Sequence, residues 1–438
     1  MQEIDQLVYQ AVFGNDKEKQ QARFEIWQRG IKAGIIPSSI NDLYMARGNK
    51  DLPNTFTVPA MNLRGMTYNT ARAVFAAAIK NKVGAMIFEI ARSEMAYTDQ
   101  TPQEYVTVIT AAALKEGWSG PLFVQGDHFQ AKANNPGEPK TGEIDKIKAL
   151  IKEALLAGFY NIDIDMSTLV DLNKSTEHEE QIPNYTYSLE LAKYIRSLEP
   201  AGITVSLGGE IGHIGGKNST IADFEAFMTG FNQGKGNLTG ISKISIQTGT
   251  SHGGIVLADG SLAEIKLDFS LLKAITQVGQ EKYQIGGSVQ HGASTLPDEY
   301  FYQFVENEAL EVHLATGLQN LILNHPAFPT EVLQQMYDYT DQNLATERKL
   351  DHTDEQFHYS LCKKTWGPLK KLTWNIPADN QTKIRQTLKE KFEFFFNQLN
   401  VINSQEIVNQ YIKPVIVQKT LADFALTKKH QDVKDLSD

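Results

Sequence analysis

Eight short apolar runs, each followed by a segment of helix length, constrain the fold of this chain more than any other feature of its sequence. Such runs suit buried parallel strands, and their alternation with amphipathic helices argues for a parallel α/β sheet. The expected strands are Thr55–Asn62, Gly84–Ala91, Pro121–Phe129, Asn161–Ser167, Thr204–Gly212, Lys243–Gly249, Gln284–Gly292 and Glu311–Gly317. Eight strands with helical crossovers are typical of the α/β class's (β/α)8 TIM barrel, which is the fold we expect.

An open, doubly wound sheet is the alternative arrangement of such elements. Its phosphate-binding fingerprint, G-x-G-x-x-G, should follow the first strand. The stretch MNLRGMTYNT, which begins at Met61, lacks that fingerprint, and this favours the barrel. We expect the barrel over residues 52–345, a helical N-terminal extension over 1–51 and a helical C-terminal extension over 346–438. Aromatic residues at helical spacing in QTKIRQTLKEKFEFFFNQLNVI should pack against the barrel or against another subunit.

Charge and cysteine content narrow the classes of ligand. The formal net charge is -10, whereas binding to nucleic acid or anionic lipid needs a basic surface. The one cysteine, Cys362, excludes an internal disulfide and a cysteine-cluster metal site, and we expect it to be buried in a helix. The N-terminus lacks a basic start followed by an apolar core, and no apolar run reaches 18 residues. We therefore expect a cytoplasmic protein with a small-molecule ligand and with no nucleic-acid or membrane partner.

Polar residues gather at the carboxyl ends of the expected strands. Catalytic groups of (β/α)8 barrels meet there, because these ends converge on one mouth. The residues at these ends are Asp127, His128, Asp165, Glu210, His213, His252, His291 and His313. Of the ten histidines in the chain, half are among them, although strand ends make up only about a tenth of a barrel. A metal explains this convergence better than chance does.

His128, His252 and His291 fit the ligand set of a catalytic zinc ion. Zinc at such a site takes three protein ligands, commonly histidines, and keeps one position open for water or substrate. Each histidine taken singly has another interpretation, a hydrogen-bonded residue in a loop. Two of the three occur as His-Gly, in TSHGGI and VQHGAST, and glycine lets the backbone come close to a ligand. The sequence therefore predicts a Zn²⁺ site.

Carboxylates accompany these histidines. Glu210 lies in GGEIGHIGG, where glycines weaken a strand unless something must approach its backbone. We expect Glu210 to orient a metal-bound histidine, with a structural salt bridge as the alternative. Asp163 and Asp165 alternate along one strand, so both should face the barrel interior. Because unpaired buried carboxylates are costly, at least one of them should meet a cation or a hydrogen-bond network.

Taken in order, the motifs resemble those of the class II, zinc-dependent fructose-bisphosphate aldolase superfamily over about residues 56–320. The matching stretches are TVPAMN, the GDH that ends at His128, the IDMS that contains Asp165, the EIGHIGG that begins at Glu210, the GTSHGG around His252 and the QHGAS around His291. The resemblance implies that the three histidines bind zinc and that Asp127 moves the proton of the hydroxyl on the cleaved carbon. It also implies that Asp165 and Glu210 support the site.

The resemblance completes the set of candidate residues. The catalytic candidates are Asp127, Glu210 and His213. The substrate-binding candidates are Asn62, Arg92, Asp165, Gly253, Gly292, Ser294, Glu311 and His313. Among these, Gly253, Gly292 and Ser294 would line a phosphate pocket. Homo-oligomers are common in the family, so we expect one here.

The stretch after the fifth strand departs from the family's pattern. The family has an acidic pair there, one member of which handles the proton on the enediolate carbon, and this chain has Lys217, Asn218 and Ser219. Another base would have to serve instead. The candidates are His213, Glu177, Glu179 and Glu180.

The eighth and second strands depart as well. The family's Asn-x-Asp-Thr, which grips the substrate and its phosphate, is replaced by Glu311–Leu314, and a carboxylate there would repel a phosphate. In the second strand, Glu89 and Arg92 stand where the aldolases have a glutamine and a small residue. This pair is more similar to the so-called non-catalytic subunit of tagatose-bisphosphate aldolase.

Three functions follow from these patterns. The leading one is a zinc-dependent aldehyde-lyase that cleaves or forms a carbon–carbon bond in a ketose or ketose phosphate through a metal-stabilised enediolate. The alternative is a ketose epimerase that breaks the bond and rejoins it on the other face, which moves no proton on the enediolate carbon. A third is a non-catalytic subunit of an aldolase complex, against which the retained histidines and Asp127 count.

Overall fold

Eight parallel strands form a closed barrel, with a ninth beside them. The computed structural model describes residues 3–212, 217–249 and 267–426. The barrel strands are β2 (Val58–Asn62), β3 (Ile87–Ala91), β4 (Gly120–Gln130), β7 (Asn161–Asp165), β8 (Ser206–Glu210), β9 (Lys243–Ile246), β10 (Ser288–Gln290) and β11 (Glu311–Leu314). They pair in the order β4-β3-β2-β11-β10-β9-β8-β7, and a β4–β7 pairing closes the ring. This confirms the expected (β/α)8 fold, since seven of the strands lie within their predicted runs and β4 exceeds its run by one residue at each end.

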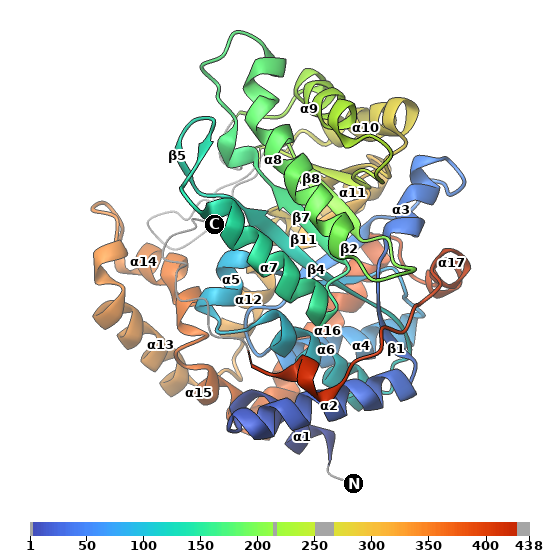
Figure 1. Cartoon of the computed structure of the whole chain (residues 1–438). Coiled ribbons are helices and arrows are strands. Elements are labelled where there is room, and N and C mark those ends of the chain that lie inside the picture. Colours follow the sequence, from blue (N-terminus) through green and yellow to red (C-terminus); the bar gives the residue numbers. More distant parts are fainter. Residues whose placement is uncertain (1–2, 213–216, 250–266, 427–438) are drawn as a thin grey trace.

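Helices follow each barrel strand, and several precede or follow the barrel as a whole (Figure 1). The barrel helices are α4 (Thr67–Asn81), α5 (Arg92–Tyr97), α6 (Pro102–Glu116), α7 (Glu143–Ala157), α8 (Glu177–Leu198), α9 (Ile221–Lys235), α10 (Phe269–Val278), α11 (Phe301–Glu306) and α12 (Thr316–Leu323). The others are α1 (Ile4–Phe13), α2 (Asp16–Lys32), α3 (Asn41–Gly48), α13 (Thr330–Asn343), α14 (Asp354–Leu361), α15 (Lys370–Trp374), α16 (Ala378–Gln398) and α17 (Gln405–Tyr411). None of the helices within the described ranges has both the length and the apolar character needed to span a membrane.

The helix α6 shows how local chemistry sets these boundaries. The Thr101 side chain accepts a hydrogen bond from the Glu104 backbone N–H, and Pro102 occupies the first turn, where its missing N–H costs nothing. The helix ends at Gly117, whose φ of +76° suits glycine. The chain therefore leaves α6 in a direction that returns it to β4.

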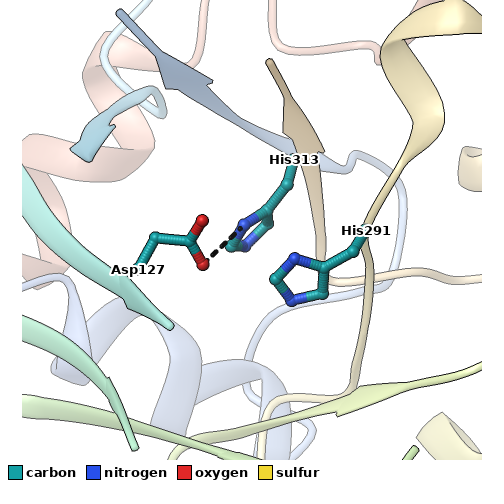
Figure 2. A group of neighbouring side chains, drawn as sticks. All are labelled: Asp127, His291 and His313. Carbon is teal, nitrogen blue, oxygen red and sulfur yellow. Dashed lines mark ion pairs between the residues drawn. The ribbon is translucent and has the colours of Figure 1, made fainter. Parts of the chain in front are cut away.

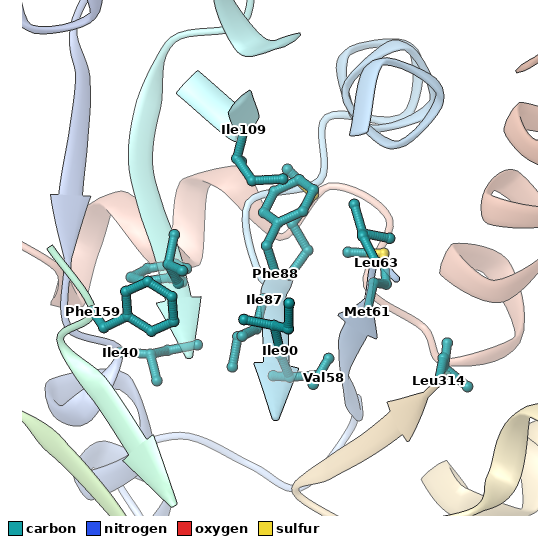
Figure 3. Close-up of a cluster of buried hydrophobic side chains, with 14 of the residues drawn as sticks. Ile40, Val58, Met61, Leu63, Ile87, Phe88, Ile90, Ile109, Phe159 and Leu314 are labelled. Carbon is teal, nitrogen blue, oxygen red and sulfur yellow. The ribbon is translucent and has the colours of Figure 1, made fainter. Parts of the chain in front are cut away.

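The apolar core lies between the strands and the surrounding helices. Figure 3 shows Ile87 and Phe88 of β3 beside Met61 of β2 and Ile109 of α6, and all four side chains are at most 1% exposed. Strands covered by helices bury both faces, which explains why the sequence runs are almost continuously apolar. This core holds the strand ends in fixed positions around the mouth.

The N-terminal extension contains a strand that the sequence did not predict. β1 (Ile35–Ser38) pairs in parallel with the first half of β4. Asn161 of β7 ties it in, since its Oδ1 accepts from the Ile40 N–H at 2.9 Å and its Nδ2 donates to the Ser38 carbonyl at 3.3 Å. The helical character expected for the extension is confirmed by α1, α2 and α3, but β1 was not predicted because four residues that include Pro37 carry no strand periodicity.

The C-terminal helix packs on the barrel as expected. Phe392, Phe395 and Phe396 of α16 are buried, and the ring of Phe395 lies 4.8 Å from that of Phe301 in α11. Cys362 is buried too, at the end of α14. The division of the chain at residues 51 and 345 stays a prediction.

Candidate active site

A bulge in β4 turns two consecutive side chains toward the mouth, the carboxyl ends of the barrel strands. From Gly126 to Phe129 the strand advances three residues while its neighbour β7 advances two, so β4 contains an extra residue. His128 adopts a left-handed φ of +40° within it. Neighbouring residues of a regular strand point to opposite faces, but a bulge re-aims a side chain. Asp127 and His128 therefore both reach the same site.

Glycine at position 126 is required by this bulge. A Cβ there would lie 2.5 Å from ring carbons of Phe129, closer than side chains pack. Gly208 in β8 leaves room for the side chain of Asp163, since a Cβ at position 208 would lie 2.2 Å from Oδ1 of Asp163. These close approaches explain two of the glycines that the sequence places in strands.

Two carboxylates fix the imidazole of His128. Its Nδ1 lies 3.0 Å from Oδ2 of Asp165 and 3.2 Å from Oε2 of Glu210. Asp165 is itself held by hydrogen bonds from the Ser167 N–H at 3.0 Å and from the Gln130 amide at 2.7 Å. The expectation that a strand-four carboxylate meets such a network is confirmed. Glu210 contacts the same nitrogen, and its predicted role in orienting His128 stays a prediction.

His291 comes to the same place from β10. The centroid of its ring lies 4.3 Å from that of His128, and its Nε2 lies 3.0 Å from the Ser245 hydroxyl oxygen. His128, Glu210 and His291 each offer a donor atom within 4.8 Å of the others. Two imidazoles and a carboxylate are a donor set that catalytic zinc takes. The described residues therefore fit a zinc ion, although His252, the third predicted ligand, lies outside the described residues.

Burial and crowding shift the pKa values in this cluster. Burial, aided by the charge of Asp165, raises the pKa of Glu210 to about 8. Burial alone would lower the pKa of His128, but Asp127 and Glu210 hold it well above its usual value. Burial would raise the pKa of Asp165, but hydrogen bonds from His128 and Ser167 keep it low. Without a metal, Glu210 and His128 therefore carry protons that a metal ion would displace.

A second set of donors lies beside the first. Figure 2 shows Asp127 of β4, His313 of β11 and His291, which directly follows β10, converging, with an ion pair between Asp127 and His313. The rings of His291 and His313 have centroids 4.0 Å apart. His313 also lies 3.0 Å from Oε2 of Glu89 and 2.7 Å from Oε1 of Glu311. The ring of His313 is thus enclosed by carboxylates.

The other predicted site residues differ in where they lie and in what they contact. His213 and Gly253 lie outside the described residues. Asn62 donates to Glu94 at 2.5 Å, while its buried Oδ1 has no hydrogen-bond partner among the described residues. Arg92 forms an ion pair with Glu143 and donates to the Gln130 carbonyl, so both of these contacts are with protein groups.

The predicted phosphate pocket is only partly described. Gly292 has a left-handed φ of +69° at the turn after β10. The Ser294 hydroxyl oxygen accepts a hydrogen bond from the Gly317 N–H at 2.9 Å. Both residues lie at the mouth end of the barrel, and their role toward a phosphate stays a prediction.

An interior layer of polar side chains lies beneath the mouth, of which only the inward direction of Asp163 was predicted. Its members, all at most 4% exposed, are Glu89, Gln125, Asp163, Lys243 and Glu311. Lys243 donates to Asp163 at 3.0 Å, to Gln125 at 2.7 Å and to Glu311 at 2.5 Å. The available signal was a lysine, a glutamine and acids inside otherwise apolar strand runs, because barrel layers are usually branched and apolar.

Comparison with known proteins agrees with this architecture. A family model described as fructose-bisphosphate aldolase class-II matches residues 50–395. The chain belongs to the class II fructose-bisphosphate aldolase family. No curated protein matches this family member in a sequence search.

Three solved structures share the aldolase-family fold at low sequence identity. A probable tagatose 6 phosphate kinase from Sinorhizobium meliloti 1021 has a TM-score of 0.55 and 13% identity, and the match covers 81% of this chain and 98% of that one. A fructuronate-tagaturonate epimerase from Cohnella laeviribosi has a TM-score of 0.52 and 13% identity, over 90% and 86% of the two chains. A fructose-bisphosphate aldolase from Campylobacter jejuni has a TM-score of 0.50 and 16% identity, over 83% and 94%. At these identities the similarity concerns the fold.

Proposed function

We propose that the chain is a zinc-dependent enzyme that breaks or makes a carbon–carbon bond of a ketose or ketose phosphate by aldol chemistry. The family supports this class of reaction. The observation that carries the proposal is the convergence of His128, Glu210 and His291 donors within 4.8 Å, next to the carboxylate of Asp127. Oδ1 of Asp127 lies 3.8 Å from Nε2 of His128.

His128 and His291 would hold the metal, together with His252 from the sequence. Zinc held there would supply Lewis-acid polarisation of the carbonyl group of the substrate. A metal-bound histidine usually donates its other ring N–H to a carboxylate. Asp165 meets Nδ1 of His128 in this way and would leave Nε2 free of that contact for a metal.

Asp127 carries the proton of the reaction. In the cleavage direction its carboxylate takes the proton from the hydroxyl beta to the carbonyl. The oxygen then forms a double bond to its own carbon, which becomes the carbon of an aldehyde. The adjacent carbon–carbon bond breaks, and its electrons pass to the carbonyl group to give an enediolate fragment. In the reverse direction Asp127 returns the proton. The buried Oδ1 of Asn62 is available to accept a hydrogen bond from a substrate hydroxyl.

An epimerase is the second candidate because of the stretch at 217–219. Lys217 and Asn218 are exposed, and the backbone N–H of Ser219 bonds to the Gln247 carbonyl at 2.9 Å. An aldolase must protonate its enediolate fragment before release, and this stretch supplies no carboxylate. Retro-aldol cleavage followed by rejoining on the other face needs no such proton. One solved structure with this fold is described as a fructuronate-tagaturonate epimerase.

Product analysis tests these functions against a third, a non-catalytic subunit. Zinc-loaded protein is mixed with fructose and tagatose bisphosphates, monophosphates, free ketoses and keto-uronates, and the products are followed by carbon-13 NMR. Cleavage fragments establish the aldolase. A new ketose without fragments establishes the epimerase. No conversion of any ketose, with zinc bound, contradicts the proposal and favours the subunit.

A further inference from the structure

The charged interior layer beneath the mouth needs a function. Placing ions in a low-dielectric core is expensive even when they are paired, and apolar residues of the same size are often as stable. Four carboxylates, those of Glu89, Asp163 and Glu311 from the layer and that of Asp127 from the mouth, surround the ammonium of Lys243 and the imidazole of His313. Such an arrangement suits the orientation of a reactive group better than it suits stability.

Glu311 is fixed from below. Its Oε1 accepts hydrogen bonds from Lys243 and from the Gln125 amide at 2.9 Å. Its Oε2 accepts from the hydroxyl of Tyr44. Tyr44 belongs to α3 of the N-terminal extension and is fully buried. With these three donors, Glu311 lies too deep to grip a substrate and is held in one orientation.

Glu311 in turn orients His313. Oε1 of Glu311 lies 2.7 Å from Nε2 of the imidazole, which directs the opposite nitrogen, Nδ1, toward the mouth. Nδ1 lies 3.0 Å from Oε2 of Glu89 and 3.4 Å from Oδ1 of Asp127 (Figure 2). A continuous path of contacts therefore runs from Tyr44 through Glu311 and His313 to Asp127.

We infer that Glu311 and His313 are positioning residues that hold the Asp127 carboxylate for proton transfer, and that Tyr44 anchors them from the N-terminal extension. This inference rests on the proposed role of Asp127. The ion-pair contact of His313 Nδ1 with Oδ1 at 3.4 Å restricts rotation of the carboxylate, and a general base needs such a fixed position to take a proton. The N-terminal extension is then part of the catalytic apparatus and not an accessory.

Tyr44→Phe tests the inference at a distance from the mouth. Removing one hydroxyl should lower kcat about five- to tenfold while KM, zinc content and melting temperature stay near the wild-type values. Tyr68→Phe is the matched control, because the Tyr68 hydroxyl also bonds a carboxylate, Asp5 Oδ1 at 2.7 Å, but on the outside of the barrel. The control should keep the full kcat. An unchanged kcat in Tyr44→Phe overturns the inference.

Variants of His313 separate positioning from metal binding. His313→Asn keeps an N–H close to the place of Nδ1 and should retain several times more activity than His313→Leu. Both should keep one zinc ion per chain. Loss of zinc in His313→Leu would make this ring a metal ligand with Asp127 and His291, and would overturn the positioning role.

Nitrogen-15 NMR of histidine-labelled protein gives a readout without substrate. The ring signals of His313 should shift in Tyr44→Phe and in Asp127→Asn, while those of His325, which bonds Thr387 far from the barrel interior, stay unchanged. If the wild type converts no ketose, the proposed function fails while these shifts still test the contacts. If the wild type is active and the His313 signals do not shift in either variant, the positioning inference fails while the proposed function stands.

Discussion

Nδ1 of His128 lies 3.0 Å from Oδ2 of Asp165, and in the proposed zinc site this contact would hold the ring of a metal ligand in place. Asp165→Asn should therefore weaken zinc binding about 10- to 100-fold, as loss of a carboxylate behind a histidine ligand does elsewhere. Competition against a coloured chelator measures the affinity. Asp171→Asn, in a surface turn with Asn173, is the control and should bind zinc as the wild type does. Equal affinities of the two variants would contradict the ligand assignment of His128.

Zinc binding should release protons, and more strongly so below pH 8. In the metal-free protein the pKa of Glu210 is about 8 and that of His128 lies well above its usual value. Both groups hold protons at pH 6 to 7 that the metal must displace, so affinity rises as pH rises toward 8. Titration calorimetry in two buffers with different ionisation heats counts the protons, and Glu210→Gln should release fewer. Affinity that is independent of pH between 6 and 8 would rule out this exchange.

Gly126→Ala should disturb the bulge that presents Asp127 and His128. The new methyl would meet the Phe129 ring at 2.5 Å, which we expect to cost about 1–3 kcal/mol and to displace both side chains. Gly240→Ala is the control, because the nearest atom to its Cβ lies at 3.4 Å. The free energy of unfolding, measured with urea, and the zinc affinity should both fall in Gly126→Ala and stay unchanged in Gly240→Ala. A Gly126→Ala protein with unchanged zinc affinity would show that the bulge does not position the site.

The strands could be predicted because burial on both faces leaves continuous apolar runs, and the order of polar residues at their ends located the mouth. The sequence could not predict that Asp127 and His128 face the same site. Strand alternation places neighbouring side chains on opposite faces, and the motif GDH does not indicate a bulge. Lys243 was read only as the start of a strand. β1 was missed because it is short and pairs with Gly120–Phe123 of β4, which lie far along the chain.

Lys243→Met should be strongly destabilising. It leaves the carboxylates of Asp163 and Glu311 buried without their ammonium partner, a change that typically costs about 3–5 kcal/mol. Lys80→Met breaks an exposed ion pair with Glu393 and should cost less than about 1 kcal/mol. Urea unfolding of the metal-free proteins compares the two. Similar free energies of unfolding would mean that the interior ion pairs carry little stability.

The most direct test of the account is the dependence of catalysis on one metal ion held by His128 and His291. The metal is removed with a chelator, zinc is titrated back, and conversion of the ketose identified by product analysis is measured at each step. Conversion should be absent without zinc, rise linearly to one equivalent per chain, and stay absent in His291→Ala. Full conversion by the metal-free protein, or by His291→Ala, would contradict a zinc-dependent aldol reaction at this mouth.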